Sequence, residues 1–302
     1  MRDTKQRTAF TMIELIMVIV IFGIVAMISA DIFVKIYDNY IIARTMNTLQ
    51  TQTELTLDQI AKRLQSRIKD STIARKEANS TDYLFLSDAD DSYKVLEWIG
   101  TADAARRGLW NGTIVAPGWS GFIDLDASGR AAVSTPGSRL DYADTIIASL
   151  SENAVDLTGT AGWPAVVMDG HVGDYNVSSY GWDPYTDNDY ALLVKRNGTT
   201  LLDFNDTAAE KEIYEHYKLA WSAYAIVPQC PAGVTDDCNL TLFYNYRPWQ
   251  RQKLEDGNSS LLAEHVTTFK FNQTGDVVRL KLCIGEHFYD NNISFCKEKV
   301  VF

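Results

Sequence analysis

The stretch KQRTAFTMIELIMVIVIFGIVAMISA, residues 5–30, decides how the rest of the 302-residue chain is interpreted. Between Phe10 and Ala30 its one charged residue is Glu14. A helix of about 20 such residues is roughly 30 Å long, which matches the hydrocarbon core of a bilayer. Arg2, Lys5 and Arg7 precede it, and basic residues favour the cytoplasmic side. The sequence therefore predicts a membrane-spanning segment at 10–30, with the remainder of the chain exported.

Glu14 is the residue that an ordinary membrane anchor does not explain. A carboxylate inside a membrane helix costs a few kcal/mol and usually marks a function. If the chain is cut just before Phe10, a new α-amino group stands four positions upstream, on the same helix. That amine would neutralise Glu14 of its own chain or of an adjacent subunit.

Lys5 to Ile16 resembles the class III signal of type IV prepilins. In that family a prepilin peptidase cuts between a small residue and Phe on the cytoplasmic side, the new Phe amine is N-methylated, and the fifth mature residue is Glu. Phe10 and Glu14 match those positions, and Ala9 stands where Gly is usual. The resemblance covers about thirty residues and implies Ala9 and Phe10 as processing residues and Glu14 as an assembly residue.

Two other interpretations of the segment remain. One is an uncleaved signal anchor, in which Glu14 has no role. The other is a secretory signal peptide cut after Ala30, because Ile28-Ser29-Ala30 is an acceptable small-residue site. The apolar run is long for a signal peptide and its helical pattern continues past Ala30.

The fold class expected is α+β, with a long N-terminal helix packed on an antiparallel sheet. Neither Gly nor Pro occurs from Ala26 to Ile99, which permits a helix from Phe10 to about Ser71 or Ala78. An amphipathic stripe with helical spacing comprises Met46, Leu49, Thr53, Leu57, Ile60, Leu64 and Ile68. The expected parts are a cytoplasmic leader at 1–9, a transmembrane segment at 10–30, an amphipathic continuation at 31–78 and an exported β-rich head at 79–302. This is the lollipop form of type IV pilins.

The head is predicted to be mostly strands joined by short turns. Alternating or apolar runs predict strands at 83–87, 92–99, 190–195, 218–227, 240–246, 265–272, 277–285 and 294–302. Residues 100–190 are rich in Gly, Asp, Ser and Trp and show weak periodicity, so we expect loops with short elements, an insertion into the head.

The segment from Leu261 to Phe271, followed by a turn and Val278-Arg279-Leu280, resembles the C-terminal sheet of J-type minor pseudopilins of type II secretion. The two resemblances imply a structural subunit, a minor pilin or pseudopilin, of a type IV pilus-like fibre or a secretion pseudopilus. They also imply three kinds of partner: other pilins bound through the helix, the prepilin peptidase and an inner-membrane assembly platform. The implied location is the bacterial inner membrane, single-pass, with the head in the periplasm or, after assembly, on the cell surface. A surface binding protein or enzyme that only borrows the anchor is the alternative.

Four cysteines fall into two close pairs, Cys230 with Cys238 and Cys283 with Cys296. Each pair brackets a turn between predicted strands, and an exported domain lies in an oxidising compartment, so disulfides between neighbours are favoured. A zinc site is the rival interpretation, although the spacings do not match paired C-x-x-C and His287 is the one nearby histidine.

Nine Asn-x-Ser/Thr triplets occur, several times more than the composition predicts. Six carry an acid two residues earlier, which resembles the extended acceptor of bacterial N-linked oligosaccharyltransferases, at Asn79, Asn176, Asn205, Asn239, Asn258 and Asn292. Glycans at these positions would require surface loops. The alternative is that Asn, Asp, Ser and Thr simply cluster in turns.

No catalytic motif, cofactor site or metal site is predicted. The four histidines are scattered and form no H-E-x-x-H cluster, and no phosphate-binding loop is present. The acidic runs that begin at Asp124 and Asp183 resemble calcium loops only weakly, because Thr135 stands where an EF-hand needs Glu, so solvated loops are the simpler interpretation. The net charge of −11 speaks against nucleic acid as a partner.

Overall fold

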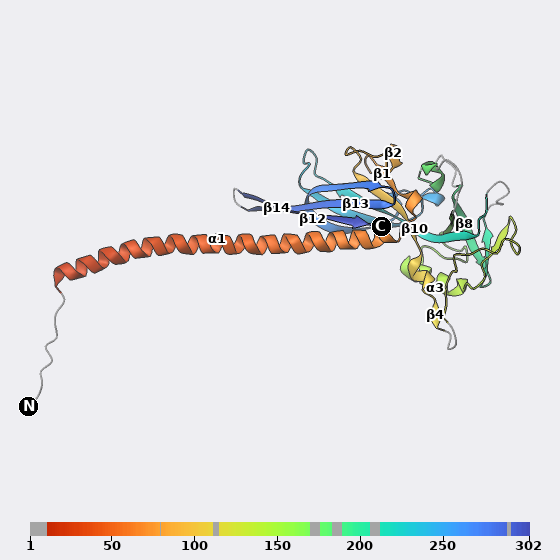
Figure 1. The fold of residues 1–302 in the computed structure, drawn as a ribbon, viewed down its shortest axis with the longest axis horizontal. Helices are drawn as coiled ribbons and strands as arrows, with labels where there is room; N and C mark the ends of the chain where they lie inside the picture. The colour runs from red at the N-terminus through yellow and green to blue at the C-terminus, as the bar shows by residue number, and fades with distance from the viewer. Residues whose placement is uncertain are drawn as a thin grey trace, which may run out of the picture. The chain divides into compact units, whose positions relative to one another are not determined.

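The computed structural model describes residues 11–78, 80–110, 115–169, 176–182, 189–205, 212–288 and 291–302. The chain divides into two compact units, one that ends at Gln50 and one that runs from Thr51 to Phe302. The long first helix contributes to both units. The second unit, called the head below, holds the strands (Figure 1).

The helical elements are α1 (Met12–Gln65), η1 (Lys69–Ser71), α2 (Asp103–Arg106), α3 (Leu140–Leu150), η2 (Val177–Tyr180), η3 (Pro248–Gln250) and η4 (Leu254–Asp256). The strands are β1 (Ile73–Arg75), β2 (Tyr83–Phe85), β3 (Val95–Thr101), β4 (Leu109–Trp110), β5 (Val115–Ala116), β6 (Ala132–Ser134), β7 (Ala165–Asp169), β8 (Ala191–Asn197), β9 (Leu201–Phe204), β10 (His216–Gln229), β11 (Cys238–Tyr246), β12 (Asn258–Thr274), β13 (Val277–Phe288) and β14 (Asn291–Val301). A long helix followed by a large antiparallel sheet is an α+β fold, so the predicted class is confirmed.

The predicted end of the first helix, at Ser71 or Ala78, is wrong. The helix ends at Gln65 because the next backbone groups pair with β3. The amide of Ile68 donates to the Ile99 carbonyl at 2.8 Å, and the amide of Thr101 donates to the Ser66 carbonyl at 2.7 Å. The chain then enters β1, so the segment assigned to the helix from its lack of Gly and Pro is the start of the sheet.

Twelve strands of the described chain form one sheet, whose main path has the order β14-β13-β12-β11-β10-β7-β8-β9-β6. Strand β10 is the branch point. Residues Ala220 to Ile226 pair with β3 on one edge. On the other edge, residues His216 to Ala220 pair with β7 and residues Ala223 to Gln229 pair with β11. One long strand thus joins two smaller sheets.

All eight predicted strands correspond to strands of the structure, although two of them have an unexpected neighbour. The segments predicted at 83–87 and 92–99 became β2 and β3, and both pair with β1. Strand β1 lies in the segment that was predicted to continue the helix as far as Ala78. The hairpins β12–β13 and β13–β14 follow the predicted antiparallel meander.

The part of α1 within the head packs on the sheet through its predicted stripe. Thr53, Leu57, Ile60 and Leu64 are buried. The Thr56 hydroxyl donates to the carbonyl of Leu262 in β12. On the edge strand β14, two lysines reach the helix and form ion pairs, Lys297 with Glu54 at 2.9 Å and Lys299 with Asp58. The last turns of the helix therefore cover the C-terminal strands (Figure 1).

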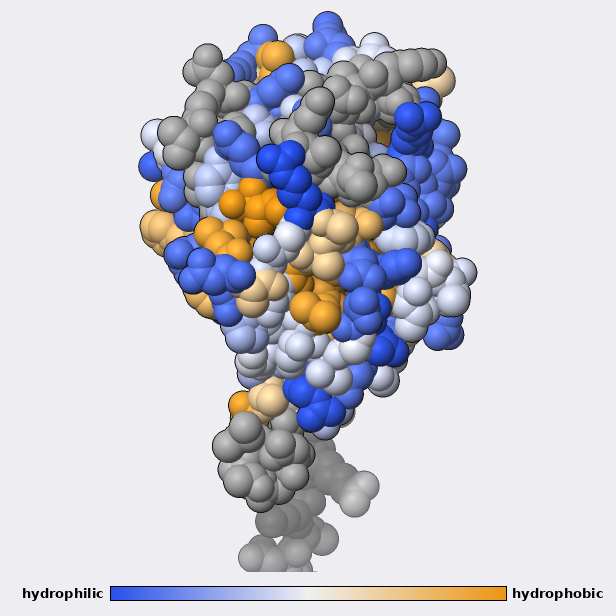
Figure 2. Space-filling model, turned by 90° about the vertical axis from the view of Figure 1, so that its right-hand side faces the viewer, coloured by the Kyte–Doolittle hydropathy of each residue, from blue (hydrophilic) through white to orange (hydrophobic). Residues whose placement is uncertain are grey.

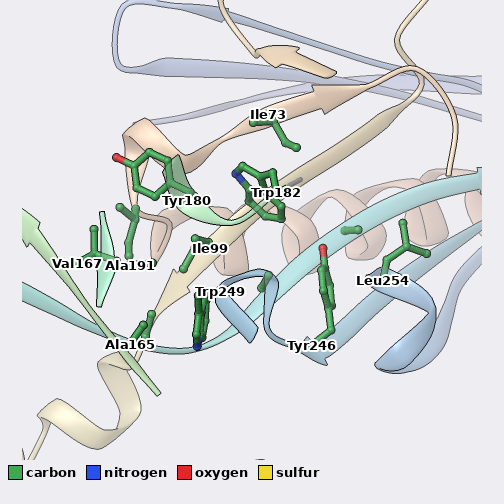
Figure 3. Close-up of a cluster of buried hydrophobic side chains, with 14 of the residues drawn as sticks. Ile73, Ile99, Ala165, Val167, Tyr180, Trp182, Ala191, Tyr246, Trp249 and Leu254 are labelled. Carbon is green, nitrogen blue, oxygen red and sulfur yellow. The ribbon is translucent and has the colours of Figure 1, made fainter. Parts of the chain in front are cut away.

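A second hydrophobic layer packs near the branch point, in which Ile73 and Ile99 meet residues of the loops that follow β7 and β11 (Figure 3). Trp182 and Trp249 are buried there, and each indole N–H is satisfied by a backbone carbonyl. Trp182 donates to Ser71 at 3.1 Å and Trp249 to Trp163 at 2.9 Å. These bonds tie the two loops to the segments that lead into β1 and β7.

Residues 100–190 are more ordered than the sequence predicted. They contain the 11-residue helix α3 and strand β7, which is inserted between β10 and β8. A cluster of buried side chains from α3, β7, β8 and β10 includes Leu140, Ile147, Val166, Val194 and Leu219. The segment therefore builds a large part of the head's core and is not a loop-rich insertion.

In the face shown in Figure 2 the coloured surface is mostly hydrophilic, with small hydrophobic patches.

Candidate assembly site at the start of the N-terminal helix

Thr11 and Glu14 form a reciprocal cap at the first turn of α1. The Thr11 backbone amide and hydroxyl donate to Glu14 Oε2 at 3.2 and 3.0 Å, and the Glu14 amide donates to Thr11 Oγ1 at 3.4 Å. This is a capping box, in which a Thr and an acid three residues later satisfy each other's backbone amides. The pattern T-x-x-E before an apolar run is the sequence signal for this cap, and it was not among the predicted features.

Glu14 is exposed, and among the described residues no cation lies within ion-pair distance of it. Its carboxylate already accepts two hydrogen bonds from Thr11, which also places it at the positive end of the helix dipole. The isolated chain thus holds the carboxylate in a fixed position and leaves its charge available to an external cation.

The helix that follows is apolar on all sides. An 18-residue window of α1 has a mean hydropathy of 2.7, and none of that window is buried within the protein. Large apolar side chains such as Ile16, Phe22 and Met27 are more than half exposed. A helix that is apolar all round needs a non-aqueous environment or other helices around it.

The family described as "prokaryotic N-terminal methylation motif" matches residues 4–30. The chain carries a type IV prepilin-like signature. The match spans most of the leader, Phe10, Glu14 and the apolar run, so it confirms the resemblance drawn from these residues. No curated protein and no solved structure matches the chain.

The structure describes only part of the predicted processing and assembly site. Ala9 and Phe10 lie outside the described residues, whereas Glu14 lies on the first turn of α1. Thr11, which stands between Phe10 and Glu14 in the sequence, caps the first turn of the helix.

Both predicted disulfides are present in the structure, Cys230–Cys238 and Cys283–Cys296, and no free cysteine remains in the described chain. The first closes the β10–β11 turn. The second joins directly opposite residues of β13 and β14. Cysteines in disulfides cannot ligate zinc, so the alternative interpretation of a zinc site is wrong.

The predicted glycosylation residues lie in different surroundings. Asn176, Asn205 and Asn239 are exposed, Asn258 is half-buried at the first residue of β12, and Asn292 lies in β14. Asn79 lies outside the described residues. Asn239 lies within the sheet, in β11 with β10 paired on one side and β12 on the other, whereas Asn205 follows the end of β9. The acid two residues before Asn239 is Asp237, whose carboxylate lies 2.9 Å from His265 Nδ1.

The acidic runs show no metal-binding geometry where they can be described. The Asp124 carboxylate accepts the backbone amide of Ala127 at 3.2 Å and so closes a turn. Within the described ranges no group of three His, Cys, Asp or Glu side chains has the geometry for a metal. Most of the second run, 183–188, lies outside the described residues.

Proposed function

We propose that this protein is made as a prepilin, cut between Ala9 and Phe10 by a prepilin peptidase and methylated on the new Phe10 amine. The mature chain then serves as a structural subunit of a type IV pilus-like fibre or a type II secretion pseudopilus. The observation that carries this proposal is a capped, exposed carboxylate at the start of an apolar helix, inside a matched methylation motif.

The apolar segment supports single-pass insertion into the inner membrane before assembly. Arg2, Lys5 and Arg7 would stay in the cytoplasm with the peptidase, and the head would lie in the periplasm. Two disulfides in the head suit that oxidising side of the membrane. After assembly the head would lie on the fibre surface.

In assembly, Glu14 would pair with the Phe10 amine of a neighbouring subunit. The attraction between two unit charges is several times stronger in apolar surroundings than in water, so the pair gains strength once the helices pack around it. The Thr11 cap would hold the carboxylate oriented before its partner arrives. Exclusion of water by the surrounding helices would then select a neighbour in the correct register.

The C-terminal meander β12–β14 supports, on pattern alone, the more specific role of a J-type minor pseudopilin. A minor pilin of a retractable fibre fits the same features. Both roles require an inner-membrane assembly platform and other pilins as partners, and neither requires catalysis by this chain.

We further propose N-linked glycans on the exposed acceptors. Asn205 follows the last residue of β9, and Asp203 stands two residues before it. The side chain of Asn205 is exposed, which suits attachment of a bulky hydrophilic group. Peptide mass analysis of the native protein would show added mass at Asn176 and Asn205. Unmodified peptides at all six acceptors would contradict this part of the proposal.

Fibre incorporation of a Glu14→Ala variant tests the assembly role. We expect processed, membrane-inserted protein whose amount in sheared fibres falls at least about tenfold, because a desolvated amine would lose its partner. Asp31→Asn, which removes a carboxylate just after the apolar run, is the matched control and should leave incorporation unchanged. Incorporation of Glu14→Ala at the level of the unmodified chain would overturn the proposal.

A further inference from the structure

A groove of about 660 Å³ lies where the last turns of α1 meet the end of β3 and the middle of β10. Trp221 and Tyr224 of β10 form its less exposed side. The charged residues that line it are Lys62, Arg63, Arg107 and Asp103. The volume lies within the range of about 300–1,000 Å³ that ligand-binding pockets occupy. The groove is therefore large enough for a short segment of a polymeric ligand.

The aromatic side of the groove depends on an irregularity in β10. Side chains alternate along a strand, so residues three apart, such as Trp221 and Tyr224, ordinarily point to opposite faces. The pairing of β10 with β3 changes register between Ala220 and Ser222, which leaves Trp221 as an extra residue. A bulge of this kind re-aims a side chain and is common next to active sites. Here it accompanies two aromatic side chains that line one groove.

The ring of Tyr224 is held in place from behind. It stacks on Trp98 of β3, with ring centroids 5.8 Å apart and ring planes inclined by 22°. It also lies close over Gly100, where a Cβ would come within 2.5 Å of Tyr224 Cε2. A wall that is already fixed loses little conformational freedom when a ligand binds, so this packing favours affinity.

Helix α1 contributes a polar face to the groove. Gln59, Lys62, Arg63 and Ser66 recur at helical spacing and line it together. Lys62 is exposed, as is Arg107 at the end of α2, and neither forms an ion pair within the described part of the chain. Arg63 donates to the Gln59 carbonyl at 3.2 Å, and no described carboxylate pairs with it. These cations are therefore available to a ligand.

The charges of the groove restrict the kind of ligand that it suits. Three cations and one carboxylate, 3 − 1, give the lining a net charge of +2 on a chain of net charge −11. An anionic ligand is therefore favoured. Asp103 is exposed, and its carboxylate has no ion pair among the described residues. It repels a second anion but accepts hydrogen bonds from hydroxyl groups.

We propose that this groove binds an acidic oligosaccharide, a segment of a polymer whose sugar units carry carboxylates. Such a ligand combines carboxylates for Lys62 and Arg107, hydroxyls for Asp103 and apolar ring faces for Trp221 and Tyr224. An acidic peptide or a DNA strand offers fewer hydroxyl donors, and the acidic surface of the chain also repels a phosphate backbone.

This binding activity goes beyond the structural role proposed above. It is measured on the isolated chain, whether or not that chain is processed or enters a fibre. Failure of the sugar site and failure of the assembly role are therefore distinguishable.

Fluorescence anisotropy of labelled hexagalacturonate and hexamannuronate tests the proposal. The full chain is kept in a polyoxyethylene detergent, which contains no sugar. We expect saturable binding of at least one of these oligosaccharides at about 0.15 M salt. Its affinity should exceed that for a hexaglutamate peptide or an oligothymidylate of the same length at least about tenfold. Absence of binding, or equal affinity for all the anionic polymers, would overturn the proposal.

Removal of two cations locates the site. Lys62→Ala with Arg107→Ala should weaken oligosaccharide binding at least about tenfold, because two charge-assisted contacts are lost. Arg44→Ala with Arg279→Ala removes two exposed cations outside the groove and gives the same net charge, so it is the matched control. Equal weakening in the two double variants would show that the ligand binds elsewhere or responds only to net charge.

Asp103→Ala separates a sugar site from a purely electrostatic one. Attraction between charges alone predicts tighter binding once this carboxylate is gone. A sugar site predicts binding several-fold weaker, because hydroxyl groups of the ligand lose their acceptor. Tighter oligosaccharide binding by Asp103→Ala would contradict the proposal.

Discussion

At the scale of single residues, Thr11 has a role that is separable from that of Glu14. Its amide and hydroxyl hold the Glu14 carboxylate, and its side chain accepts the Glu14 amide. Thr11→Ala should cost the first turn of the helix about 1 kcal/mol, whereas Thr11→Ser keeps the cap. Amide hydrogen exchange of residues 12–15 in micelles should be several-fold faster in the Ala variant. Equal exchange in the two variants would contradict the capping role.

Arg75 and Glu97 form a buried ion pair in the head. Arg75 Nε lies 2.6 Å from Glu97 Oε1, and the side chains are 9% and 2% exposed. The Tyr246 hydroxyl donates to the same carboxylate at 3.4 Å. Truncating one partner leaves a buried charge unpaired, so Glu97→Ala should lower the free energy of unfolding by about 3–5 kcal/mol.

Chemical denaturation of the head checks this value against a surface pair. Lys299→Ala removes an ion pair whose partners are 39% and 53% exposed, and it should cost less than about 1 kcal/mol. Similar costs for the two variants would show that the buried pair contributes no more than a surface one.

Burial also sets how the head responds to alkaline pH. Desolvation, reinforced by the nearby Glu97 carboxylate, raises the pKa of Tyr246 well above its ordinary value, and burial likewise raises the pKa of Tyr217 and Tyr224. The folded head therefore keeps these protons after the unfolded chain has lost them, at about pH 10. Their contribution to stability is complete below about pH 10 and is lost as the pH rises toward the folded-state values.

Thermal unfolding between about pH 8 and pH 11.5 should show this loss in the unmodified head and a shallower loss in Tyr246→Phe. A melting temperature that stays constant as the pH passes the ordinary tyrosine pKa in the unmodified head would contradict the assignment.

At the scale of elements, prediction succeeded where a simple period decided the structure. The strands β10 to β14 are apolar or alternating runs bounded by turns, and the stripe on α1 has helical spacing. Helix α3 was missed although Leu140, Ala143 and Ile147 share its buried face. Asp144 interrupts that face and is tolerated because Arg196 pairs with it at 2.9 Å and the Leu157 amide donates to it. A polar core residue with partners far along the chain cannot be recognised from local pattern.

The helix end was mispredicted for a similar reason. Residues 66–75 have no helix breaker, but their backbone groups find distant partners in β3, as when Ile68 bonds to Ile99 and Ile73 pairs with Glu97. Tertiary pairing overrode local propensity, as it commonly does for short segments.

At the scale of the whole molecule, the start of the chain was more predictable than the head. The signature at 4–30 and the position of Glu14 follow from adjacent residues. The branch at β10 follows from the pairing of this strand with β3, β7 and β11, which no local motif records. The Thr11 cap lies between these cases, because its T-x-x-E pattern is local but did not enter the prediction.

The N-terminal mass of the protein, isolated from its native membrane and from sheared fibres, is the decisive measurement. Prepilin processing predicts a chain that begins at N-methylated Phe10 in both fractions, without residues 1–9. A chain that begins at Met1 would indicate an ordinary signal anchor, and one that begins at Asp31 a secreted protein. Either result would contradict prepilin processing and, with it, assembly through Glu14.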